Sequence, residues 1–385
     1  MSEYQYYEFR AVDRLLTREE MSTLSGLSSR ATVTPSSFIN VYNFGDFRGD
    51  PRDLMGRCFD VFVYMTNWGT RWLMLRVPSQ LLDDQGARAY EAGDVLSVER
   101  AAGDHTLLSF CYEGEGGGWE QGEGWLPSLL PVRAALMAGD ERALYLGWLL
   151  GVQLGTVDDE TLEPAPPPGL ADLDDALEQL VDFLCLDDAL VVAAGEGSDA
   201  RPTRSLATED VAGWLDTLPG EEKDSLLAAL ITAETPTLAL ELRRRAATAC
   251  RSVVPANAGD RRSVAELRER ADALRAGWSA EAAHNEAVER ARLELEAAER
   301  RRQRILAMRG KASVLWRKVE QQIARRQARS YDAAVSTLCD LRDLAALEGT
   351  TAEYRDKLSA LCGAQRKKTT LIDRLRAAGL LDAEG

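Results

Sequence analysis

Three aspartates lie close together in the stretch GDFRGDPRD, residues 45–53. Divalent cations are held by several carboxylate oxygens on a loop, and a bound cation can activate water for hydrolysis. Asp46, Asp50 and Asp53 are therefore candidate ligands of a metal-dependent hydrolase. The same stretch also fits the start of a helix, with Asp50 as the cap, Pro51 in the first position and Asp53 near the positive end of the helix dipole. Because the spacing matches no calcium or nuclease signature, the structural interpretation is favoured.

A second candidate is the turn that carries Trp68, Arg71 and Trp72. Tryptophan and arginine carry binding energy at protein interfaces more often than other residues. The alternative is a β-hairpin whose tryptophans pack on a sheet, because Asn67 and Gly69 tolerate the positive φ that a tight turn requires. We take this turn as the best partner-binding surface in its part of the chain.

Basic residues are concentrated between Arg300 and Arg329, where Glu320 is the only acid. Such a run can bind the phosphates of a nucleic acid or an acidic protein surface. The alternative is a solvated helix with Glu–Arg pairs, and the sequence supports it up to about residue 300. The candidate residues are Arg301, Arg302, Arg304, Arg325, Arg326 and Arg329.

The sequence has few residues that could form other kinds of catalytic or metal site. The chain has two histidines, and its six cysteines show no short spacing, so neither a zinc site nor a disulfide framework is predicted. His105 and Cys111 have no third group to orient a catalytic dyad. The glycine-rich loop from Gly114 to Trp125 contains no phosphate-binding motif, and its glutamates would repel phosphate. We predict no catalytic residue and no cofactor, and the balance favours a protein without enzymatic activity.

The elements that would position these candidates form an α+β N-terminal domain with a largely antiparallel sheet. Runs rich in valine, threonine and aromatic residues predict strands, among them Val61 to Met65 and Arg71 to Val77 on either side of the tryptophan turn. A short helix is expected from Pro51 to about Phe59.

The C-terminal two-thirds is expected to be mostly α-helical, because apolar residues recur there every three or four positions. A long coiled-coil-like helix is expected within this part, and a stretch with four prolines predicts a stiff linker before it. The predicted order is an α+β domain (1–130), a helical extension (131–162), the proline-rich linker (163–169), a helical domain (170–255), a long basic helix or helical hairpin (256–330) and a helical tail (331–385).

Length and composition indicate a globular protein of several domains, with 385 residues, 45% hydrophobic and 28% charged. The longest nearly uncharged apolar run is too short to cross a bilayer, and the N-terminus lacks a signal-peptide pattern. We expect a cytoplasmic protein that does not bind membranes. Charge divides the chain: residues 1–240 hold 16 basic and 41 acidic residues, net −25, whereas residues 241–385 hold 30 and 21, net +9.

Several stretches resemble parts of known bacterial families. Helical regions of uncharacterised bacterial proteins, some with a SWIM-type zinc finger, are similar to TEDVAGWLDTLPGEEKDSLLAAL, LALELRRRAA, YDAAVSTLCDLRDLAALEG and LIDRLRAAGL. The front of another bacterial family resembles YEFRAVDR, NVYNFGDFRGDP and NWGTR. The resemblance implies a bacterial source. It implies no zinc site, because the closely spaced Cys and His ligands are absent, and it transfers no catalytic residues.

Three functional hypotheses follow. The leading one is a non-enzymatic bacterial scaffold or accessory subunit whose helical surfaces bind a protein partner or a second copy of the chain. The first alternative is a nucleic-acid-associated factor of a defence or repair assembly that binds through Arg300 to Arg329. The second alternative is the metal-dependent hydrolase at Asp46, Asp50 and Asp53.

Overall fold

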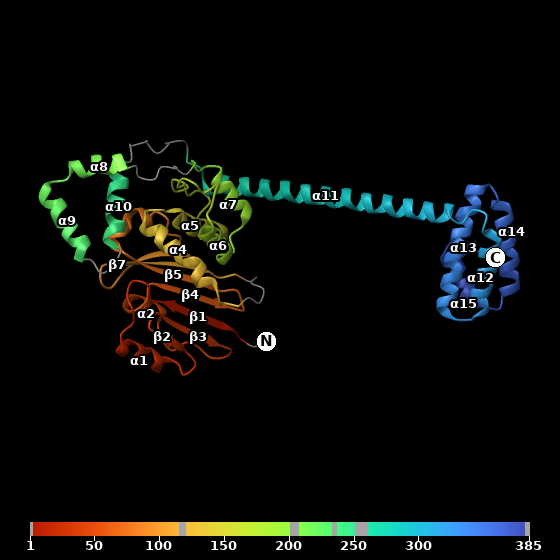
Figure 1. Cartoon of the computed structure of the whole chain (residues 1–385), viewed down its shortest axis with the longest axis horizontal. Helices are drawn as coiled ribbons and strands as arrows, with labels where there is room; N and C mark the ends of the chain where they lie inside the picture. The colour runs from red at the N-terminus through yellow and green to blue at the C-terminus, as the bar shows by residue number, and fades with distance from the viewer. Residues whose placement is uncertain (1–2, 115–120, 201–207, 233–236, 251–260, 382–385) are drawn as a thin grey trace. The chain divides into compact units, whose positions relative to one another are not determined.

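A computed structural model describes residues 3–114, 121–200, 208–232, 237–250 and 261–381. It confirms the predicted α+β class, with an antiparallel sheet in the N-terminal part and mostly helices after it (Figure 1). The chain divides into two compact units, Met1–Trp278 and Ser279–Gly385. No helix in the described ranges is both long and apolar enough to span a membrane.

The sheet of the first unit has seven strands among the described residues, in the spatial order β2-β3-β1-β4-β5-β7-β6, and every neighbouring pair is antiparallel. The hairpin predicted between β4 and β5 is confirmed, and Gly69 in its turn has a φ of 106°. The strands are β1 (Gln5–Arg10), β2 (Thr32–Thr34), β3 (Ser37–Tyr42), β4 (Val61–Thr66), β5 (Arg71–Pro78), β6 (Leu96–Ala101) and β7 (His105–Tyr112).

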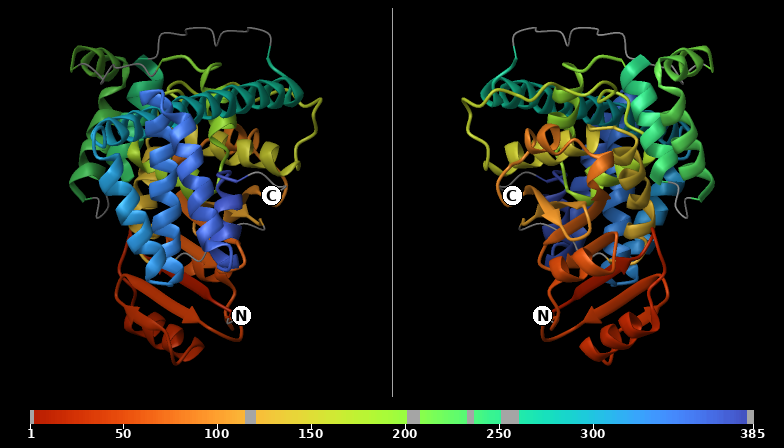
Figure 2. Two further views of the ribbon diagram at one scale, coloured as in Figure 1. Left: turned by 90° about the vertical axis from the view of Figure 1, so that its right-hand side faces the viewer. Right: turned by 90° about the vertical axis from the view of Figure 1, so that its left-hand side faces the viewer.

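The sheet is apolar on both faces, because successive residues of a strand point to opposite sides. In β1, Tyr6 belongs to one core and Tyr7 to the other, and in β5 Leu73 and Met74 divide in the same way. Helices α1 and α2 cover one face, whereas α4 and α5 cover the other (Figures 1 and 2). The smaller helices around the sheet are α1 (Arg18–Leu27), α2 (Pro51–Arg57), η1 (Ser79–Leu81) and α3 (Asp84–Arg88).

The larger helices of the first unit pack on the sheet and on one another. Helices α8, α9 and α10 form a separate group, in which α9 lies outermost (green, Figure 1). The first turns of α11 bury Val264, Leu267 and Ala271 in the main core. The bounds are α4 (Trp125–Met137), α5 (Arg142–Leu154), α6 (Asp175–Phe183), α7 (Asp188–Gly195), α8 (Thr208–Thr217), α9 (Gly220–Thr232), α10 (Thr237–Cys250) and α11 (Val264–Leu306).

A buried ion-pair network joins the sheet to α4. Arg133 on α4 forms a bidentate pair with Asp13, with N···O distances of 2.9 and 2.6 Å. The Nε of Arg133 also donates to the backbone carbonyl of Arg76 on β5 at 2.6 Å. Because a guanidinium in this position has a carboxylate and a carbonyl as partners, its burial is compensated.

Two predicted domain boundaries fall inside continuous structure. The boundary at residue 130 lies within α4, which begins before Pro131 and continues through it. The predicted linker at 163–169 does not separate two cores, because Glu163 is buried and Leu170 and Leu177 share one core with α5. Apolar residues on both sides of this segment belong to the same core.

The second unit contains α11 from Ser279 onward and the helical bundle that follows it. The predicted long helix ends at Leu306, earlier than the apolar spacing suggested, and Gly310 with a φ of 72° precedes the next helix. The core joins Val319, Leu338 and Leu371 from three of the helices. These helices are α12 (Ala312–Ala324), α13 (Ala328–Glu348), α14 (Thr351–Gln365) and α15 (Thr369–Ala377).

Candidate functional site

Two of the three aspartates proposed as metal ligands have partners within the same short helix. Asp50 caps α2 and accepts a hydrogen bond from the backbone N–H of Arg52 at 2.8 Å. Asp53 pairs with Arg57 at 2.9 Å, and Asp46 is exposed. Within the described residues there is no group of three histidine, cysteine or acidic side chains arranged to hold a metal ion. The hydrolase hypothesis therefore has no supporting geometry.

The tryptophan turn presents one of its three candidates to solvent. The side chain of Trp68 is 48% exposed. Arg71 is buried and donates to two backbone carbonyls at the end of α6, at 3.1 and 3.4 Å. The indole N–H of Trp72 donates to the hydroxyl of Ser109 at 2.7 Å. Arg71 and Trp72 therefore have hydrogen-bond partners inside the first unit, and Trp68 is the most exposed of the three candidates.

Two of the six arginines proposed for nucleic acid are paired within the second unit. Arg301 pairs with Asp343, and Arg304 pairs with Asp340 at 2.5 Å, because the end of α11 lies beside α13. These pairs neutralise part of the predicted basic surface. All six candidates are exposed, and the four without these pairs are Arg302, Arg325, Arg326 and Arg329.

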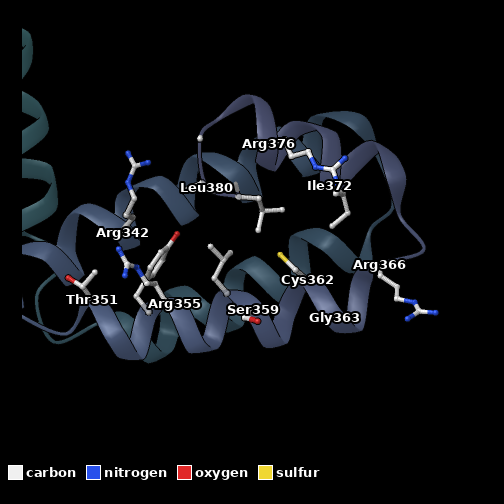
Figure 3. Close-up of a pocket in the computed structure, with 14 residues that line it drawn as sticks. Arg342, Thr351, Arg355, Ser359, Cys362, Gly363, Arg366, Ile372, Arg376 and Leu380 are labelled. Carbon is white, nitrogen blue, oxygen red and sulfur yellow. The ribbon is translucent and has the colours of Figure 1, made fainter. Parts of the chain in front are cut away.

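A groove in the second unit gathers arginines that the sequence did not single out as a group. It has a volume of about 960 Å³ and lies among α13, α14 and α15 (Figure 3). Arg342 and Arg355 lie at one end, and Arg366 and Arg376 lie at the other. No aspartate or glutamate is among the described residues that line it. We call this site the arginine groove.

The floor of the arginine groove is apolar. Leu380 lies between the two pairs of arginines and Ile372 lies beside Arg376 (Figure 3). Leu358 also lines the groove and is 5% exposed. The hydroxyl of Tyr354 donates to the carbonyl of Leu338 at 3.0 Å, which fixes the ring against the core. The groove therefore offers cationic ends and a hydrophobic centre.

The groove has little capacity for acid–base or nucleophilic chemistry. Burial raises the pKa of Tyr354 to about 12, so its hydroxyl stays protonated at neutral pH. Burial also raises the pKa of the Cys362 thiol, and a thiol is a weak nucleophile in its protonated form. No histidine is among the described lining residues. The arrangement can bind an anionic, partly apolar ligand.

The groove is electropositive because two of its four arginines have no ion pair among the described residues. Arg342 contacts Asp343 at 3.3 Å, and Arg376 contacts Asp373 at 4.0 Å. In the part of the chain that the structure describes, neither Arg355 nor Arg366 forms an ion pair. Residues 300–381 hold 19 Lys+Arg and 8 Asp+Glu, a net charge of +11, so the surroundings reinforce the positive potential.

A second hollow borders the groove. Arg326, Arg366, Lys367 and Lys368 line it together with Glu320. The ammonium of Lys368 donates to the carbonyl of Ile323 at 3.2 Å, which holds the two segments side by side. Arg366 lines both hollows, so the positive surface is continuous from one to the other.

Sequence reasoning had one local signal for this site, the run Arg366-Lys367-Lys368. Arg342, Arg355 and Arg376 come from three different helices, and their separation along the chain follows no helical period. Packing of the helices is what unites them. The loop from Gly114 to Trp125 lies partly outside the described residues.

Comparisons with protein-family models, with curated proteins and with solved structures find no match to this chain. The resemblance to bacterial families stays a prediction, and the function has to be inferred from the geometry of the site.

Proposed function

We propose that the protein is a non-enzymatic adaptor that binds an acidic amphipathic helix of a protein partner in the arginine groove. The observation that carries this proposal is the position of four arginines around an apolar floor with no carboxylate among the described lining residues. An amphipathic helix in a groove places apolar anchors at intervals of three and four residues. Its carboxylates would meet the guanidinium groups in charge-assisted hydrogen bonds.

The apolar floor favours a protein helix over a nucleic acid. A phosphate backbone offers charge but no aliphatic groups to cover Ile372 and Leu380. Bases can stack on exposed aromatic rings, but Tyr354 is only 6% exposed and its hydroxyl is bonded to the core. A helix with glutamate and leucine side chains satisfies both parts of the groove.

The bacterial cytoplasm is the compartment that we propose for this adaptor. Five cysteines in the described ranges are free thiols: Cys58, Cys111, Cys185, Cys339 and Cys362. Free thiols persist in a reducing compartment, which supports the assignment. The bacterial source is supported by the sequence resemblance described above.

A nucleic acid is the second candidate ligand, bound on a different surface. Arg302, Arg325 and Arg329 are exposed, and Arg326 lies beside Lys367 and Lys368 around the second hollow. Phosphate contacts with these side chains would weaken steeply as salt is added.

The test is fluorescence anisotropy with the full-length protein and three labelled probes. One is a synthetic helix of leucine and glutamate in amphipathic order, the second has lysine in place of glutamate, and the third is a single-stranded DNA oligonucleotide. We expect the glutamate helix to bind and the lysine helix not to bind. If only the DNA binds tightly, the adaptor proposal is wrong and nucleic-acid binding becomes the proposed function.

A pair of charge reversals locates the binding surface. Arg355→Glu with Arg366→Glu is expected to weaken the glutamate helix at least about 10-fold, because two charge-assisted contacts become repulsive. The matched control is Arg309→Glu with Arg317→Glu, which changes the same charge at exposed positions outside the groove. Equal losses in both variants would show that net charge, not the groove, binds the helix.

A further inference from the structure

Helix α9 of the first unit has an apolar face that nothing covers within the described residues. Leu227, Leu230 and Ile231 are 58%, 41% and 80% exposed. Residues spaced by three and four positions lie on one face of a helix, so these three side chains form one continuous strip. Exposed apolar strips of this kind mark contact sites more often than isolated exposed residues do.

The same helix carries acidic residues at its start. Residues 220–232, which form α9, contain three Asp+Glu and one Lys, a net charge of −2. Glu221 and Glu222 lie in the first turn of α9, and Asp224 lies one turn before Leu227. This helix therefore has carboxylates at its start and an apolar strip after them.

We propose that α9 of one copy of the chain binds in the arginine groove of a second copy. This inference rests on the proposed function and names the acidic amphipathic helix that the groove accepts. Leu227, Leu230 and Ile231 would cover the apolar floor, and Glu221 and Asp224 would meet the arginines at one end. Charge complementarity between α9, net −2, and surroundings of net +11 selects this occupant.

The two surfaces differ, so the pairing is head to tail. Each copy offers one helix and one groove, and binding of one surface leaves the other free for a further copy. Association of this kind either closes into a ring of two or more copies or continues as an open chain, and it depends on protein concentration. It also weakens as salt is added, because part of the contact is electrostatic.

Sedimentation velocity of the full-length protein over a range of concentrations tests the inference. We expect the wild type to form dimers or larger species. Leu230→Glu with Ile231→Glu is expected to give monomers, and both residues are exposed, so the fold is retained. Its matched control is Leu293→Glu with Leu295→Glu, two exposed apolar residues of α11. Monomers from this control alone would overturn the inference and assign association to α11.

Mixing two variants gives the decisive result. The α9 variant keeps its groove, and the variant Arg355→Glu with Arg366→Glu keeps its α9. Each is expected to be monomeric alone, and a one-to-one mixture is expected to form a heterodimer of twice the monomer mass. A mixture that stays monomeric overturns the inference. A wild type that is monomeric at every concentration also overturns it, whatever α9 binds within its own chain.

The same samples separate this inference from the proposed function. If the wild type is monomeric but the synthetic glutamate helix binds the groove, the adaptor function stands and its partner is a different protein. If neither association nor peptide binding occurs, both proposals are wrong.

Discussion

Asp60, the residue before β4, is fully buried and accepts two hydrogen bonds from the guanidinium of Arg76 on β5, at 2.7 and 3.1 Å. Its other oxygen accepts the backbone N–H groups of Val12 and Asp13, at 2.6 and 2.9 Å. One carboxylate therefore joins the end of β1, the start of β4 and the middle of β5.

Asp60→Asn is expected to lower the free energy of unfolding by about 3–5 kcal/mol, because Arg76 would be left buried without a counter-charge. Urea denaturation at neutral pH measures the loss. The matched control is Asp53→Asn, which removes an exposed pair with Arg57 and is expected to cost less than about 1 kcal/mol. Similar losses in the two variants would contradict a special role for the buried pair.

Acid is expected to destabilise the first unit through the same carboxylate. Burial alone raises the pKa of Asp60, but the N–H groups of Asp13 and Val12 and the charge of Arg76 outweigh it and lower the pKa below its usual value. The folded state then binds this proton less readily than the unfolded state. The stabilisation is complete above the unfolded pKa of roughly 4 and is lost as pH falls through the folded pKa.

Urea midpoints between neutral pH and about pH 3 test this dependence. The difference in stability between wild type and Asp60→Asn is expected to shrink as pH falls, because protonation removes the charge that the variant lacks. A difference that stays constant with pH would show that Asp60 is not charged in the folded protein.

The start of α11 is held by a second buried carboxylate, Glu163. It accepts the hydroxyl hydrogen of Tyr145 and two hydrogen bonds from Arg262, each 2.8 Å long. Glu163→Ala is expected to cost about 3–5 kcal/mol, because the guanidinium of Arg262 loses its counter-charge. Amide hydrogen exchange should also become faster at Val264 and the following residues of α11.

The control for this variant is Asp159→Ala. It removes an exposed ion pair between Asp159 and Arg268 at the same helix, and we expect a loss below about 1 kcal/mol without faster exchange. Unchanged exchange in Glu163→Ala would mean that the apolar contacts of α11 suffice to hold it.

Gly147 lies where α5 crosses the sheet at close range. A Cβ added there would lie 2.7 Å from Phe110 and 2.9 Å from Leu96, both of them fully buried. Gly147→Ala is expected to destabilise the protein by about 1–3 kcal/mol through overpacking, although alanine favours a helix. In Gly56→Ala the added atom meets nothing within 4 Å, so we expect no loss and a gain of up to about 1 kcal/mol. Thermal denaturation of both variants compares the two effects.

The sequence predicted those turns and helix ends that depend on residues close together in the chain. The cap at Asp50 and the hairpin at Gly69 depend on residues within a few positions of each other, and both are present in the structure. The alternating strands were readable for the same reason. The helical extension predicted from residue 131 starts too late, because α4 begins at Trp125 and contains Pro131.

Contacts between distant residues were not readable from one sequence. Arg71 was expected at a surface, but it bonds to carbonyls of α6 that lie more than 100 residues further along the chain. The arginine groove has the same origin, since Arg342, Arg355 and Arg376 meet only after three helices have packed. Arg301 and Arg304 were proposed to bind a nucleic acid or an acidic partner, and in the structure they pair with Asp343 and Asp340 of α13.

The two outer strands of the sheet limit how the chain can aggregate. β2 is three residues long, and β6 carries the exposed charges of Glu99 and Arg100. A short or charged outer strand is a poor template for another chain to extend the sheet. Fibre formation by strand addition is thereby discouraged in a protein whose interior strands are rich in valine, leucine and phenylalanine.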